Sequence, residues 1–155
     1  MAETATRRAT PRRRPDPDDA STWTNVLAEV PLFRDLGRRN LAKVARTGRI
    51  ARFHDQTPIV RAGERGEALF VVLDGAVDVR RRGHPDVRLG AGSFFGEMAL
   101  LDGGVRSASV VAAGPVTCLV IGQSRFHKLL RGEPAIAIAL LKEVAARLRA
   151  VQATA

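Results

Sequence analysis

The chain has 155 residues, of which 45% are hydrophobic, and its formal net charge is +9. This length suffices for one domain with a hydrophobic core. No apolar run reaches the roughly 18–20 residues that a membrane-spanning helix needs, and the N-terminus lacks the apolar core of a secretory signal. The single cysteine, Cys118, excludes a disulfide within one chain, so we expect a cytoplasmic protein.

The positive charge invites comparison with nucleic-acid-binding proteins. Arginines outnumber lysines by 22 to 3, which indicates a compositional bias as much as a binding face. The charge is also spread along the chain and is not gathered on one recognition helix. We therefore expect no nucleic-acid partner, and positive potential that serves a phosphate ligand or an acidic partner.

Residues 1–20 have no apolar periodicity. They contain five arginines and three prolines, and end in an acidic stretch. This composition predicts a disordered tail over residues 1–20, followed by one domain over residues 21–155.

Residues 22–48 have helical periodicity, which Pro31 interrupts and Gly48 ends. Short apolar runs separated by Gly and Pro then follow over residues 49–93 and predict strands. Residues 68–73 form the most apolar of these runs, and Asp74-Gly75 after it is a hairpin signal. Strands of this length and spacing predict a sandwich or barrel, here a β jelly roll.

The C-terminal third predicts two more strands, residues 107–112 and 116–121, on either side of Gly114-Pro115. Ser124 is positioned to cap a short helix, and Pro134 to open a last helix that runs to about Val151. Apolar residues on that helix step by four and three, either as a seam for a second chain or as a face that packs on its own barrel. They are Ala137, Leu141, Val144, Leu148 and Val151.

The stretch with most chemical content is residues 94–110, FFGEMALLDGGVRSASV. Gly96 precedes a short run of helix formers, and the first turn of a helix attracts anions. Arg106 follows a glycine-containing turn, so a helix start and a guanidinium would hold a phosphate between them. Glu97 would repel that phosphate and suits hydroxyl groups. The ligand is then a nucleotide or a sugar phosphate.

The order Phe-Gly-Glu-x-Ala-Leu, a turn, and Arg-Ser-Ala-Ser resembles the phosphate-binding cassette of cyclic-nucleotide-binding domains. Those domains occur in catabolite activator proteins, in regulatory subunits of cyclic-AMP-dependent kinases and in cyclic-nucleotide-gated channels. The resemblance implies an α+β fold, in which a jelly roll (the double-stranded β-helix of cupin-like barrels) is flanked by N-terminal and C-terminal helices.

The resemblance also implies roles for seven residues. Glu97 would accept from the ribose 2′-hydroxyl, and Arg106 would pair with the cyclic phosphate. The backbone N–H groups of Met98 and Ala99 would donate to phosphate oxygens. Gly96 would leave room for the ribose. Ser107 would lie beside the phosphate or the base, or would have a merely structural role. Val79 would lie under the base, or would belong to the ordinary core.

The implied ligand is cyclic AMP, because catabolite activator proteins, which bind cyclic AMP, also have a Ser directly after the Arg. Cyclic GMP stays open, because a hydroxyl at this position can also contact guanine. No metal is expected. On the last helix, Leu140, Leu141 or Val144 would cover the base and Arg147 would reach its edge.

The three histidines, His54, His84 and His127, lack metal-ligand spacing, and no catalytic signature is present. We therefore expect no enzyme. The expected function is a cyclic-nucleotide sensor without a DNA-binding or catalytic domain, which signals through its C-terminal helices to a protein effector in trans or as a homodimer, with no membrane partner. The alternative is a nucleotide-free scaffold or dimerisation module of the same fold.

Overall fold

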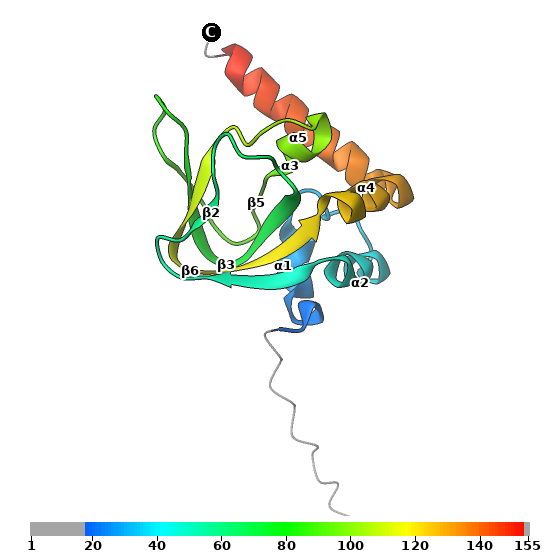
Figure 1. Ribbon diagram of the computed structural model, residues 1–155. Helices are drawn as coiled ribbons and strands as arrows, with labels where there is room; N and C mark the ends of the chain where they lie inside the picture. Colours follow the sequence, from blue (N-terminus) through cyan, green and yellow to red (C-terminus); the bar gives the residue numbers. More distant parts are fainter. Residues whose placement is uncertain (1–17, 154–155) are drawn as a thin grey trace, which may run out of the picture.

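The computed structural model describes residues 18–153 (Figure 1). In chain order the elements are the 3-10 helix η1 (Ala20–Trp23), α1 (Thr24–Glu29), α2 (Arg38–Thr47), β1 (Arg49–Phe53), β2 (Pro58–Val60), β3 (Ala68–Arg80), β4 (Val87–Leu89), β5 (Phe94–Phe95), α3 (Glu97–Asp102), β6 (Ser109–Gly122), α4 (Gln123–Gly132) and α5 (Pro134–Ala153).

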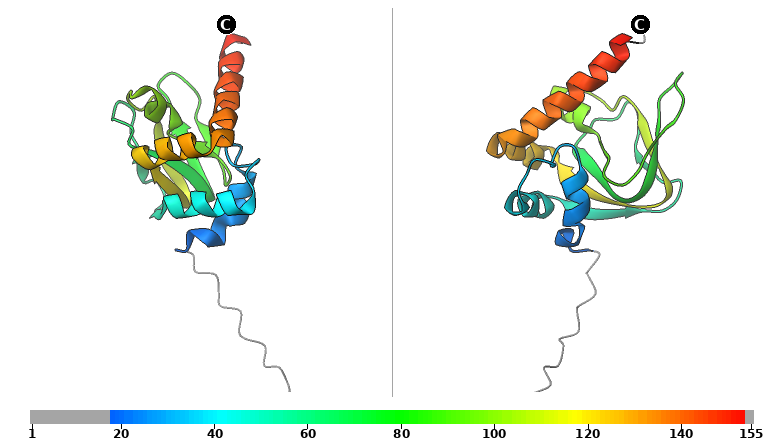
Figure 2. Two further views of the ribbon diagram at one scale, coloured as in Figure 1. Left: turned by 90° about the vertical axis from the view of Figure 1, so that its right-hand side faces the viewer. Right: turned by 180° about the vertical axis from the view of Figure 1, so that it is seen from behind.

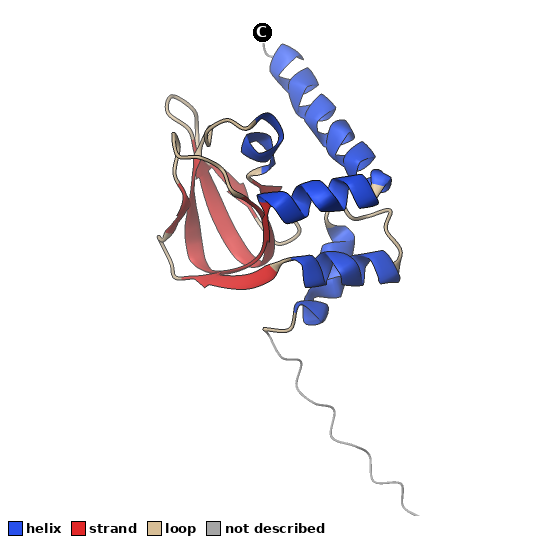
Figure 3. Cartoon of the chain, turned by 45° about the vertical axis from the view of Figure 1, so that its right-hand side comes forward, coloured by secondary structure: helices blue, strands red, loops and turns tan. Residues whose placement is uncertain are grey.

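The strands form one antiparallel sheet in the order β1-β6-β3-β4. Strand β2 also pairs with β6, and β5 also pairs with β3, so the sheet curls around the two long strands β3 and β6 (Figure 1). The helices other than α3 gather on one side of this barrel (Figure 3). The predicted α+β class, a jelly roll flanked by helices, is confirmed.

Residues 69–73 of β3 and 116–121 of β6 are buried on both faces of the sheet, and this explains why these segments are so apolar. Leu69 and Val71 pair with Ile121 and Leu119, and all four belong to the core under the helices. The residues between them, such as Phe70, face a second core inside the barrel. A strand that is buried on both faces has a continuous hydrophobic run, as residues 68–73 do.

The helical layer closes the first of these cores. In α2, Leu41, Val44 and Ala45 are buried at the spacing of one helix face. Phe33 from the turn after α1 and Phe126 from α4 fill the space between the helices and the sheet without exposure to solvent. The predicted helices around Pro31 and the last helix from Pro134 are therefore confirmed.

The predicted hairpin at Asp74-Gly75 is wrong, because β3 continues through it as one strand with irregular register on both sides of Asp74. The predicted break at Gly114-Pro115 is also wrong, since β6 is continuous. Gly75 and Gly114 both have positive φ angles, +86° and +79°, and they bend the two strands. A Cβ atom at Gly75 would lie 2.3 Å from the carbonyl oxygen of Pro115, so the bends are in contact.

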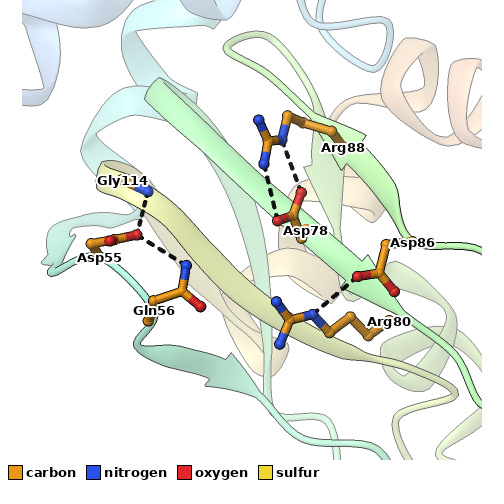
Figure 4. A network of polar contacts seen from close by, with 7 residues as sticks. All are labelled: Asp55, Gln56, Asp78, Arg80, Asp86, Arg88 and Gly114. Carbon is orange, nitrogen blue, oxygen red and sulfur yellow. Dashed lines mark hydrogen bonds and ion pairs between the residues drawn. The ribbon is translucent and has the colours of Figure 1, made fainter.

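Polar contacts fix the outer part of the barrel (Figure 4). The Gly114 N–H donates to the Asp55 carboxylate at 2.7 Å, and this bond holds the pKa of Asp55 below its ordinary value. On the β3–β4 pair, Asp78 lies opposite Arg88 and accepts from its guanidinium at 2.9 Å. Such cross-strand pairs stabilise the register of a short strand like β4.

Three further expectations have different outcomes. The α4 helix begins at Gln123, and its N-cap residue is Gly122 and not Ser124. No helix among residues 18–153 is both long enough and apolar enough to cross a membrane. Most of the predicted disordered tail, residues 1–20, lies outside the described residues, although η1 already begins at Ala20.

The contact between the two bends generates a prediction. Gly75→Ala should lower the free energy of unfolding by about 2–4 kcal/mol, because it adds left-handed backbone strain to a steric overlap with Pro115. Gly83→Ala is the matched control, because Gly83 has a φ of +79° but open space around it, and should cost only about 1–2 kcal/mol. Urea denaturation measures both, and equal costs would contradict the close approach.

Candidate functional site

The candidate site is built around α3, the short helix that follows β5. Gly96 precedes it with a φ of +95°. A Cβ atom at this position would lie 2.4 Å from Arg106 Nη1 and 2.8 Å from the Ala68 carbonyl oxygen, so only glycine fits. The first N–H groups of α3, which include those of Met98 and Ala99, have no partner within the helix. Gly103, with a φ of +69°, ends α3.

Arg106 is buried at the centre of this site, with 7% of its surface exposed. Its Nη1 donates to the Gly96 carbonyl oxygen and its Nη2 to that of Ala68, both at 2.8 Å. Burial lowers the pKa of the guanidinium, and the negative charge of Glu97 raises it. An arginine remains protonated at neutral pH, so the site contains a buried positive charge.

The turn before β3 is fastened to Arg106 by its backbone. The Arg106 N–H donates to the Glu64 carbonyl at 2.7 Å, and Arg106 accepts from the Gly63 N–H at 2.9 Å. A Cβ atom at Gly66 would lie 2.4 Å from the Ala99 Cβ and 3.0 Å from the Arg106 guanidinium. The Gly63–Gly66 turn is therefore part of the site, which its sequence alone did not indicate.

Two aromatic rings support the guanidinium. Phe70 of β3 and Phe95 of β5 are register partners, and their rings stack with centroids 5.0 Å apart. The Arg106 guanidinium lies 5.9 Å from the centre of the Phe70 ring, within the range of a cation–π interaction. These two phenylalanines restrict the position of Arg106 from inside the barrel.

A cavity of about 170 Å³ opens beside Arg106. Ile59, Val60, Ala68 and Phe70 supply its apolar wall, and the other lining residues are Arg61, Glu64, Arg65 and Glu67. Ligand pockets usually measure about 300–1,000 Å³, so this cavity is smaller than a typical site for a whole ligand.

Glu97 is the first residue of α3 and is 2% exposed. Its carboxylate accepts from Nη1 of Arg147, which belongs to α5. The Arg147 guanidinium also lies 5.3 Å from the centre of the Phe94 ring. The sequence placed Arg147 near the edge of a base, but here it forms an ion pair with Glu97. Residues 50 positions apart gave no local signal for this pair.

The other predicted site residues lie at different depths. Ala99 is buried against Gly66, whereas Met98 has 53% of its surface exposed and Ser107 is also exposed. Val79 is half-buried in β3 opposite Val110 and packs against the core of the barrel. Of the seven predicted site residues, only Arg106 is among those that line the described cavity.

Helix α3 is also tied to the C-terminal helices by His127 of α4. Its Nε2 lies 2.9 Å from the Leu100 carbonyl oxygen, one of the carbonyls in the last turn of α3 that lack a partner within the helix. The cassette is thus connected to α4 through His127 and to α5 through Arg147.

Neither metal binding nor thiol chemistry is supported by residues 18–153. Within this range no cluster of three His, Cys, Asp or Glu residues could hold a metal ion. Burial raises the pKa of the Cys118 thiol to about 12, so it is an unreactive part of the barrel core.

Comparisons with known proteins agree with this geometry. Two curated relatives, from Rhizobium etli and Mesorhizobium japonicum, are named cyclic nucleotide-gated potassium channels. The first is 40% identical over 125 residues, which cover 81% of this chain and 35% of the relative. The second is 39% identical over 120 residues, which cover 77% and 33%. The chain thus spans about a third of the length of these relatives.

Solved structures are similar as well. The catabolite activator protein of Thermus thermophilus superposes with a TM-score of 0.75 at 32% identity, covering 80% of this chain and 61% of that one. The regulatory domain of Toxoplasma gondii PKA, solved with cAMP, has a TM-score of 0.71 at 27% identity, covering 83% and 50%. The profile of the cyclic nucleotide-binding domain matches residues 50–133. The resemblance of the cassette is therefore confirmed, and the chain belongs to the cyclic nucleotide-binding domain family.

Proposed function

We propose that this chain is a cyclic AMP sensor without catalytic activity, whose ligand binds between α3 and Arg106 and whose output is a movement of α5. The buried guanidinium of Arg106 is the observation that carries this proposal. Its hydrogen-bond acceptors among the described residues are two uncharged carbonyls, and it lines a cavity of about 170 Å³. Such a cation favours an anionic ligand, because a buried charge that is hydrogen-bonded only to neutral groups is costly.

The predicted residue roles are kept in this proposal. The phosphate would lie against Arg106 and the free N–H groups of Met98 and Ala99, with the ribose over Gly96 and a hydroxyl on Glu97. Ser107 would lie beside the phosphate or the base, and Val79 would stand under the base. A relative solved with cAMP supports cyclic AMP, and the Ser that follows Arg106 is consistent with it.

The output would depend on the ion pair between Glu97 and Arg147. A ribose hydroxyl and the Arg147 guanidinium would compete for the same buried carboxylate. Nucleotide binding would then release Arg147 and allow α5 to move. Leu141 or Val144 would cover the base, since Leu140, the third candidate, is 3% exposed and belongs to the core under the helices. A ligand shifts such an equilibrium only by its difference in affinity for the two arrangements, and this competition supplies the difference.

The receiver of the signal would be a protein effector. The names of the two curated relatives point to an ion channel as one class of effector. An effector on a separate chain is the other arrangement compatible with this proposal.

Calorimetric titration with cyclic AMP and then cyclic GMP, after a denaturing wash that removes carried-over nucleotide, tests the proposal. We expect saturable binding, tighter for cyclic AMP. Arg106→Ala should weaken it by about 2–5 kcal/mol, on the order of 30- to 3,000-fold, because the phosphate loses its charged partner. Arg106→Lys keeps the charge and should lose less. The proposal fails if neither nucleotide binds, or if Arg106→Ala binds as tightly as the unmodified chain.

The competition at Glu97 gives an opposite pair of expectations. Glu97→Gln should weaken cyclic AMP binding by about 1 kcal/mol, since it removes a charged acceptor for the ribose. Arg147→Ala should strengthen binding by about threefold to tenfold, because the carboxylate no longer has to be released. Titration of both variants and of the double variant measures the coupling. Weaker binding by Arg147→Ala would instead indicate that Arg147 contacts the nucleotide.

A dimerisation module of the same fold is the second candidate, and the exposed face of α5 favours it. Leu141 and Leu148 are 69% and 57% exposed and share the seam expected from the sequence. If α5 pairs two chains, sedimentation velocity should show a dimer that Leu141→Glu/Leu148→Glu converts into a monomer. If the unmodified chain is monomeric at about 100 μM, its dimer dissociates at lower concentrations, and this candidate is excluded.

A further inference from the structure

The charges of the described residues are unevenly distributed. Residues 18–153 contain 20 Lys and Arg residues and 14 Asp and Glu residues. Helices α2 and α4 together hold seven of these cations and none of these carboxylates. The rest of the described residues contain 13 Lys and Arg side chains and 14 carboxylates. The whole positive surplus of the described residues therefore lies on two helices.

These two helices lie side by side on the surface of the helical layer, and the left view of Figure 2 shows them from the front. Two contacts connect them. Arg125 of α4 donates to the Thr47 carbonyl at the end of α2 at 3.0 Å, and Lys43 lies 3.8 Å from Glu133, directly after α4. The cations of both helices thus belong to one surface.

We call this surface the α2–α4 basic face. All seven side chains are exposed, while the opposite sides of the helices are buried in the core. Arg38 and Arg39 are adjacent, and the other cations follow in steps of three or four along each helix. The α2 residues are Arg38, Arg39, Lys43 and Arg46, and the α4 residues are Arg125, Lys128 and Arg131.

The composition of the face indicates the kind of partner. The large hydrophobic side chains that are exposed in residues 18–153 lie on β4, α3, α5 and the loop after α3, and none lies on α2 or α4. A specific protein interface usually contains buried aromatic or aliphatic anchors. The α2–α4 basic face has no such anchor, so we expect its attraction for a partner to be electrostatic.

Charge alone would attract either duplex DNA or an anionic bilayer, and the shape of the face favours the bilayer. A helix with its side chains is about 10–12 Å in diameter, so two adjacent helices are broader than the roughly 12 Å major groove of duplex DNA. A planar anionic surface makes contact with both rows of cations at once. An anionic bilayer is such a surface, and each Lys or Arg near it strengthens binding by roughly fivefold.

We propose that the α2–α4 basic face is a peripheral docking surface for a bilayer that contains anionic phospholipids. The sequence led us to expect no membrane partner because a spanning segment is missing from the sequence, but a peripheral contact needs none. Docking on this face would direct the barrel strands away from the lipid (Figure 1).

Co-sedimentation of the full chain with extruded vesicles tests this, without nucleotide, so the outcome is independent of the proposed function. Vesicles of phosphatidylcholine with about 30% phosphatidylserine should bind the chain at about 0.05 M salt and release it at about 0.3 M. Vesicles of pure phosphatidylcholine should not bind it. Arg39→Glu/Lys128→Glu, one substitution on each helix, should bind at least about 30-fold more weakly.

The matched control is Arg81→Glu/Arg82→Glu, which changes the net charge equally on the exposed connection between β3 and β4. It should bind as the unmodified chain does, and circular dichroism should show both variants folded. Equal losses in both variants would overturn the proposal and indicate that binding depends on the net charge. No loss in either variant would overturn it and indicate that the N-terminal arginines bind the vesicles. Absence of vesicle binding, or tighter and equally face-dependent binding to a DNA duplex, would also overturn it.

Discussion

The burial of one positive charge, on Arg106, determines how the site is assembled. A guanidinium removed from water must be hydrogen-bonded, and the carbonyls of Gly96 and Ala68 meet this need. These carbonyls come from the start of α3 and the start of β3, so the side chain joins a helix to the sheet. The space it occupies explains the glycines at positions 66 and 96, where any Cβ atom would collide with it or its neighbours.

Glu97 connects the site around Arg106 to the C-terminal helix α5, because its carboxylate lies near Arg106 and pairs with Arg147. Glu97 affects the pKa of Arg106 and accepts a hydrogen bond from Arg147. Electrostatics at the cassette and the position of α5 are therefore linked. The bond from His127 to Leu100 adds α4 to this arrangement, so that two C-terminal helices are in contact with one six-residue helix.

The helical layer contributes two distinct surfaces. Its inner side is apolar and closes the core over β3 and β6, while its outer side on α2 and α4 carries the positive surplus. An amphipathic helix supplies both properties from one sequence, because residues three or four apart share a face. The cavity beside Arg106 is formed by the barrel and the cassette, and none of its lining residues belongs to α2 or α4.

The sequence by itself determined the fold class, the helix break at Pro31, the helix start at Pro134 and the cassette around Gly96 and Arg106, because these follow from local periodicity, turn residues and a compact motif. It misjudged Asp74-Gly75 and Gly114-Pro115, which are turn signals locally but become bends when two long strands pair through them. Only the tertiary structure decided that Arg147 meets Glu97 and that Gly66 lies against Ala99. Such contacts depend on how distant segments pack, and packing leaves no periodic signal along the chain.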